Sequence, residues 1–131
     1  MKDKIQRVVL SLSNRMGSLA LLACVWRNDS KKWDIVISAS WITRSSVKEN
    51  IGDIFDAFKE EFNGEFALRF SGIYPLATDE SFVRNLQSFI GSSTDSVELS
   101  DVRINGIDSD KIIVFASTPT RNLMTRELLP A

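Results

Sequence analysis

Residues 46–64, SVKENIGDIFDAFKEEFNG, predict one amphipathic helix more clearly than any other part of the chain. Its first four residues form a capping box, in which Ser46 and Glu49 would bond each other's free backbone N–H groups, and Gly64 is the expected terminator. The apolar residues recur at helical spacing and share one stripe: Ile51, Ile54, Phe55, Phe58 and Phe62. The opposite stripe is acidic: Glu49, Asp53, Asp56 and Glu60. A helix with one apolar face needs an apolar surface to pack on, and a sheet is the expected surface.

Short apolar runs on both sides of this helix predict that sheet. Residues 19–27 and 33–42 read as a hairpin around a polar turn, and residues 97–104 and 112–116 read as a second hairpin. Residues 66–70 alternate as a single strand, which Gly72 and Pro75 would end. Two further helices are expected, over residues 5–16 and between Thr78 and Gly91, the second with these residues facing inward: Phe82, Leu86, Phe89 and Ile90.

These elements predict an α+β fold in the order α-ββ-α-β-α-ββ. We expect a mostly antiparallel sheet of about five strands with two or three helices on one face, and the other face available to a second chain. Residues 1–118 would form one domain, since no linker separates two units. Residues 119–131 would form a C-terminal tail, which has the apolar spacing of a short helix.

The composition removes several classes of chemistry. The 131 residues contain no histidine and one cysteine, Cys24, within an apolar run. Zinc sites, internal disulfides and histidine-based nucleophile pairs are therefore not expected, and we assign no catalytic residue, cofactor or metal. Because no apolar stretch reaches the roughly 18 residues that span a bilayer, we expect a cytoplasmic protein with no membrane partner.

Charge is distributed unevenly along the chain. The net charge is −1, but residues 1–48 carry nine basic and three acidic side chains, whereas residues 49–110 carry four basic and thirteen acidic ones. This asymmetry predicts a surface with two electrical halves that could orient a charged partner or a second copy.

Two acidic clusters could bind a hard cation. One is the acidic stripe of the helix over residues 46–64, and the other is the turn that contains Asn105, Asp108 and Asp110. The stripe is interpreted as a solvated helix face, because amphipathicity alone requires one. The turn is interpreted as a hairpin turn, in which these residue types form local hydrogen bonds.

Aromatic and basic residues of the first hairpin are candidates for recognition. The basic residues Arg27, Lys31 and Lys32 lie beside the tryptophans Trp26, Trp33 and Trp41, a composition that single-stranded nucleic acid or a protein partner could use. Further interaction candidates are the acidic residues Asp53, Asp56 and Glu60 and the C-terminal residues Leu123, Met124 and Leu128.

The function predicted from the sequence is a non-enzymatic protein-interaction or regulatory module that self-associates or serves as a subunit. Its expected partner is protein, either a second copy or a charged chain. One alternative is a nucleic-acid-binding module that uses the basic, tryptophan-containing first hairpin. The other is a small enzyme that works through carboxylate or hydroxyl groups.

Overall fold

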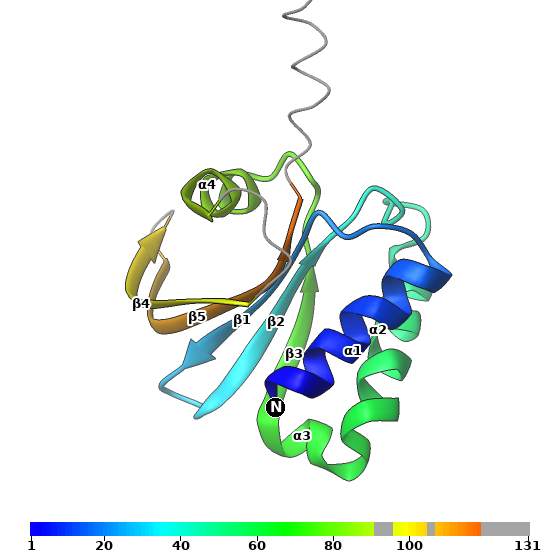
Figure 1. Cartoon of the computed structure of the whole chain (residues 1–131), viewed down its shortest axis with the longest axis horizontal. Helices are drawn as coiled ribbons and strands as arrows, with labels where there is room; N and C mark the ends of the chain where they lie inside the picture. The colour runs from blue at the N-terminus through cyan, green and yellow to red at the C-terminus, as the bar shows by residue number, and fades with distance from the viewer. Residues whose placement is uncertain (91–95, 105–106, 119–131) are drawn as a thin grey trace, which may run out of the picture.

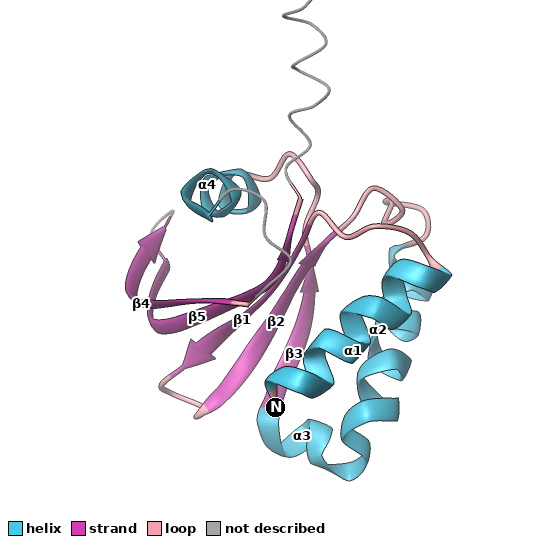
Figure 2. Cartoon of the chain, in the orientation of Figure 1, coloured by secondary structure: helices cyan, strands magenta, loops and turns pink. Residues whose placement is uncertain are grey.

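The computed structural model describes residues 1–90, 96–104 and 107–118 and confirms the α+β fold. Figures 1 and 2 show a sheet with helices on both of its faces. In chain order the elements are α1 (Lys2–Arg15), β1 (Leu21–Arg27), β2 (Lys32–Ser38), α2 (Val47–Phe62), the 3-10 turn η1 (Asn63–Glu65), α3 (Phe66–Arg69), β3 (Phe70–Pro75), α4 (Ser81–Ile90), β4 (Val97–Ile104) and β5 (Ile107–Ser117). The proposed C-terminal tail, residues 119–131, lies outside the described residues.

The sheet has five strands in the order β3-β2-β1-β5-β4. Three of its four strand pairs are antiparallel, as expected for a mostly antiparallel sheet, and the pair β2 with β3 is parallel. The parallel pair follows from the long connection through α2, because two parallel strands need a crossover between them. β3 and β4 are consequently the two edge strands.

One face of the sheet is covered by α1 and α2, which lie side by side in Figure 1. Their buried residues Ile5, Leu12 and Phe58 join strand residues such as Ile35 and Ile37 in one apolar cluster. The predicted stripe of α2 is confirmed for Ile54, Phe58 and Phe62, which are each at most 1% exposed, but the prediction is wrong for Phe55, which is 38% exposed. Two helices therefore lie on one face, as the sequence predicted.

The opposite face carries α4, which the sequence did not place there. Phe82, Val83 and Leu86 of α4 pack on Leu21 and Ile112 in a second apolar cluster. Strand β1 explains this arrangement, since Leu21–Val25 is buried at every position and so presents apolar side chains to both faces. A second helical layer is needed to cover the additional face.

Three ion pairs join α1 to the α2–η1 segment. Arg7 Nε lies 2.7 Å from Glu61 Oε1, Lys4 Nζ lies 3.5 Å from Glu65 Oε1, and Arg15 Nη2 lies 3.7 Å from Glu60 Oε1. The basic first helix and the acidic second helix thus neutralise part of each other within one chain.

Residues 66–70 differ from the prediction, because Phe66–Arg69 is helical and the strand begins at Phe70. Gly72 lies within that strand instead of ending it, whereas Pro75 is its last residue, as predicted. A strand would place Phe66, Leu68 and Phe70 on one face, but only the two phenylalanines share a packed surface. The ring centroids of Phe66 and Phe70 lie 6.0 and 5.6 Å from that of Phe58. Leu68, in contrast, is 74% exposed. Residues four apart also share a helix face, so a five-residue run fits either period.

The predicted capping box is not formed in α2. Ser46 is the N-cap residue, but no side-chain cap hydrogen bond is made there. Its hydroxyl instead lies 2.7 Å from Thr43 Oγ1 and 2.6 Å from the amide oxygen or nitrogen of Asn50. The Ser46 hydroxyl therefore bonds Thr43 of the preceding turn and Asn50, and it does not cap the backbone of α2.

Candidate functional site

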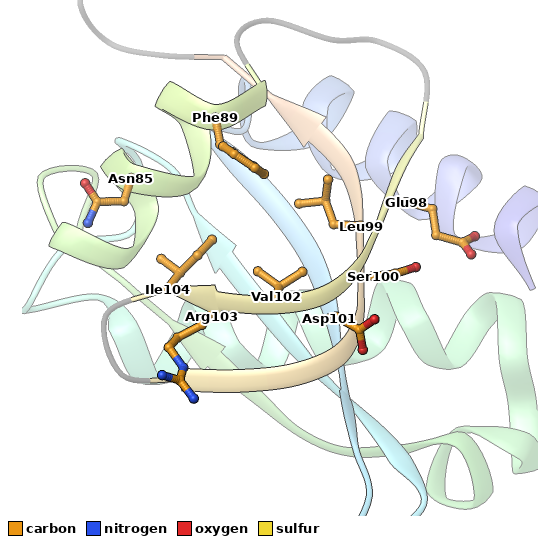
Figure 3. A pocket seen from close by; sticks show the side chains of 9 residues that line it. All are labelled: Asn85, Phe89, Glu98, Leu99, Ser100, Asp101, Val102, Arg103 and Ile104. Atoms are coloured by element: carbon orange, nitrogen blue, oxygen red, sulfur yellow. The ribbon is translucent and has the colours of Figure 1, made fainter.

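A groove of about 600 Å³ lies between α4 and the edge strand β4 (Figure 3). Phe89 reaches from α4 toward Leu99, and Val102 and Ile104 point from β4 into the same space. Phe89 is 69% exposed, which corrects the expectation that it faces inward. We call this surface, formed by these four residues with Asn85 at its rim, the α4–β4 groove.

The groove depends on a kink in β4 at Asp101. Asp101 has a φ of 51°, a left-handed conformation that is uncommon for a residue with a Cβ atom. Before the kink, Leu99 pairs with Ile112 on the α4 side of the sheet, and after it Val102 and Ile104 face that side. Odd-numbered residues therefore face α4 in the first half of β4 and even-numbered residues in the second half. The distal half of the hairpin curls toward α4, as Figure 1 shows.

Strand β5 has a buried serine opposite the residue that follows the kink in β4. Ser109, which is buried, pairs with Val102, and its hydroxyl oxygen lies 3.0 Å from Trp26 O and 2.9 Å from Lys111 O. The single hydroxyl proton can be donated to one of these carbonyl groups at a time. A small polar side chain thus satisfies backbone groups where the strand departs from regular alternation.

The side of β4 that faces away from α4 is charged. Glu98 pairs with Lys2 and Lys111, each at 3.3 Å, and the hydrogen bond from Lys2 is the main cause of the lowered pKa of Glu98. Arg103 pairs with Asp108, Nε to Oδ1, at 2.7 Å, which raises the pKa of Arg103. The edge strand β4 therefore has an acidic position near its start and a basic position near its end.

A second hollow, of about 330 Å³, lies on the same face over β1, β2 and β3. Asp34 at its edge is buried, and its two carboxylate oxygens accept hydrogen bonds from Arg27 Nη1, at 2.8 Å, and from Ser71 Oγ. The walls are apolar and include Val36 and Tyr74. Because one oxygen of Asp34 bonds Arg27 of β1 and the other bonds Ser71 of β3, this carboxylate links three neighbouring strands.

The three tryptophans make internal contacts. The rings of Trp26 and Trp33 meet edge to face at 5.0 Å, and Trp26 Nε1 donates a 3.0 Å hydrogen bond to Asn28. Trp41 Nε1 donates to Gly17 O at 3.0 Å, and a Cβ atom at Gly17 would lie 3.2 Å from the Trp41 ring. All three side chains are half-buried. Trp41 therefore closes the end of α1, and the other two stiffen the hairpin.

The basic candidates of the first hairpin lie apart from the groove. Arg27 bridges Asp34 and Asp29, with distances of 2.8 and 3.1 Å, and Lys32 Nζ donates to Ala67 O at 2.7 Å. Lys31 occupies the hairpin turn with a φ of 57° and is exposed.

The acidic candidates Asp53, Asp56 and Glu60 are all exposed on α2. Glu60 pairs with Arg15, whereas Asp53 and Asp56 make no ion pair within residues 1–90, 96–104 and 107–118. The remaining candidates, Leu123, Met124 and Leu128, lie outside the described residues.

The sequence interpretation missed the residues that form the groove. Phe89 was expected to face inward, and Leu99 and Ile104 were assigned only to the strand over residues 97–104. One signal was present: the apolar residues of β4 change parity between Leu99 and Val102, which a regular half-buried strand does not do.

No cation site is evident among the described residues, where no group of three or more His, Cys, Asp or Glu side chains lies close enough to hold a metal ion. Of the turn that the sequence singled out, Asp108 pairs with Arg103 and Asp110 accepts a 2.8 Å hydrogen bond from Asn28, whereas Asn105 lies outside the described residues. The helices in the described part of the chain are also too short or too polar to cross a bilayer.

No protein-family model, curated protein or solved structure matches the chain.

Proposed function

We propose that this chain is a non-enzymatic protein-interaction module whose binding surface is the α4–β4 groove. The observation that supports this most is the exposed ring of Phe89 beside a sheet edge, with Leu99 and Ile104 only half-buried below it. An apolar surface next to an edge strand suits a partner chain better than it suits water.

The partner would add a strand to β4. An edge strand carries unpaired backbone N–H and C=O groups, and an extended chain can pair with them while its alternate side chains fill the groove. The other edge strand, β3, contains Pro75, which has no N–H to donate. β4 contains no proline over its eight residues.

The charges of β4 specify the partner further. An antiparallel added strand would place apolar side chains against Phe89 and Leu99, a basic residue opposite Glu98 and an acidic residue opposite Arg103. Each ion pair would set the register and orientation, and the apolar contacts would supply most of the affinity.

Selection from a random ten-residue peptide library tests this proposal. Selected peptides should bind the wild-type chain in fluorescence anisotropy and should bind Phe89→Ser at least tenfold more weakly. Leu10→Ser is the matched control, because Leu10 is 62% exposed on α1 and far from the groove. Equal binding to both variants, or a failure to select any peptide, would refute the proposal.

The nucleic-acid and enzyme alternatives have less in their favour. The rings of Trp26 and Trp33, which would stack on bases, already contact each other, and each carboxylate oxygen of Asp34 already accepts a hydrogen bond, from Arg27 or from Ser71. A steep loss of oligonucleotide binding with added salt would nevertheless favour the first alternative, and this is measured easily.

A further inference from the structure

We propose that the strand added to β4 comes from a second copy of the chain, in an antiparallel β4–β4 pair centred between Ser100 and Asp101. This inference rests on the proposed function of the α4–β4 groove and names the partner. It follows from the residues of β4, VELSDVRI, and from the direction in which each one faces.

A symmetric edge-to-edge pair imposes a condition on the strand. The twofold axis is perpendicular to the sheet, so that both copies keep α4 on the same side. Residues that are opposite each other in an antiparallel pair also point to the same side. Every residue of β4 must therefore meet a residue of the second copy that faces the same side.

The kink at Asp101 allows β4 to meet this condition. In a regular strand, an axis between two adjacent residues would pair odd with even positions, which face opposite sides. In β4, odd-numbered residues face α4 before the kink and even-numbered residues face it after the kink. An axis between Ser100 and Asp101 therefore pairs residues that face the same side of the sheet.

The resulting pairs are complementary on both sides of the sheet. On the α4 side, Val97 meets Ile104 and Leu99 meets Val102. On the other side, the acidic Glu98 meets the basic Arg103 of the second copy, twice in the dimer. If the second strand were shifted by one residue in either direction, a charged side chain would lie opposite an apolar one that faces the other side of the sheet. Glu98 would then lie opposite Val102, or Leu99 opposite Arg103. The pattern therefore favours one register.

The dimer would also cover the exposed apolar surface. Because both α4 helices lie on the same side of a continuous sheet, the two grooves meet at the axis and the two Phe89 rings approach it. A pair of eight-residue strands is a small interface, so we expect a dissociation constant on the order of micromolar.

Disulfide trapping tests the partner and the register together. Directly opposite residues lie about 5 Å apart, within reach of a disulfide, whereas copies of the same residue at 98 or at 103 would be about 17 Å apart. Glu98→Cys and Arg103→Cys should each form no covalent dimer under mild oxidation, whereas an equimolar mixture should form one. Both positions are exposed, and the buried Cys24 does not compete.

Charge exchange separates the dimer from the ion pairs within one chain. Glu98→Arg should weaken self-association at least fivefold in sedimentation, and adding Arg103→Glu in the same chain should restore it. If the charges act only within the monomer, on Lys2, Lys111 and Asp108, the double variant should be no better than the single one.

Three results would overturn the inference. These are dimers of Glu98→Cys alone as abundant as those of the mixture, no covalent dimer in any sample, and a wild-type chain that sediments as a monomer at millimolar concentration. If Phe89-dependent peptide binding persists in such a monomer, the groove function stands and only the second copy is excluded as its partner. If peptide binding is also independent of Phe89, both proposals fail.

Discussion

Phe58 is the side chain whose truncation should damage the fold most. It is fully buried on α2, and its ring meets those of Phe62, Phe66 and Phe70 at 6.2, 6.0 and 5.6 Å. Phe58→Ala would remove this ring from the centre of four packed aromatic side chains and leave a cavity that the rigid sheet cannot close.

The expected loss in the free energy of unfolding is about 4 kcal/mol, the middle of the usual range for a buried phenylalanine, because three ring contacts are lost with the apolar area. With a urea m-value of about 2 kcal/mol/M, the midpoint of unfolding should fall by roughly 2 M. Phe55→Ala is the matched control, since Phe55 lies one turn earlier, is 38% exposed and has one ring contact, with Phe66 at 5.0 Å. Its midpoint should fall by less than half as much.

Urea titrations followed by circular dichroism measure both midpoints. If Phe58→Ala does not fold, Phe58→Leu keeps most of the volume and should cost roughly 1 to 2 kcal/mol. Equal midpoints for Phe58→Ala and for Asp56→Ala, whose side chain is exposed, would show that α2 packs through a different face. That result would refute the assignment of the core.

Three further predictions concern metals, the thiol and acid. EDTA should leave the melting temperature unchanged in a thermal scan, and a drop of several degrees would indicate a structural cation. Cys24 should react with a thiol reagent only on unfolding, because burial raises its pKa and blocks access; rapid labelling of the native protein would contradict this. Lys2 and Lys111 lower the pKa of Glu98, so its stabilising effect is present above the ordinary value of 4.5 and is lost as pH falls through the lower folded value. Glu98→Gln should therefore flatten acid unfolding curves, and an unchanged curve would exclude this contribution.

The elements that the sequence predicted correctly have long, regular patterns. The stripe of α2 repeats over about three turns, and the inward residues of α1, Ile5, Val8 and Leu12, are buried as expected. A pattern of this length excludes a strand, because period 2 and period 3.6 diverge within a few residues. The two hairpins were also recognisable, since turn-forming residues separate strands of similar length.

The errors arose where tertiary contacts outweighed a short local pattern. Phe66–Arg69 is too short for its period to decide between helix and strand, and the aromatic cluster around Phe58 selects the helix. Likewise, the side of the sheet that α4 covers depends on where β5 and β4 join it, which is a long-range property. No local feature of residues 81–90 contains that information.

The groove was hidden from the sequence for a related reason. Phe89 follows the helical spacing of a core residue, but its ring is 69% exposed at the groove between α4 and β4, which curls toward this helix. That curl depends on a single residue, Asp101, in a conformation that aspartate adopts more readily than most side chains do. The change in apolar parity along β4 is the only trace of it in the sequence.

The charge asymmetry of the chain has a different meaning once the fold is considered. Its basic and acidic halves meet in the monomer, where Lys4, Arg7 and Arg15 of α1 pair with acids of the α2–η1 segment. Such exposed pairs contribute only about 0 to 1 kcal/mol each, but they leave less unpaired charge to attract a partner. Asp53 and Asp56 remain without ion pairs in the described residues and are the part of the acidic face still available for docking. Recognition at β4 requires only two charged side chains, Glu98 and Arg103. Their positions along one strand can fix the register of a second strand, whereas the net charge of a surface cannot.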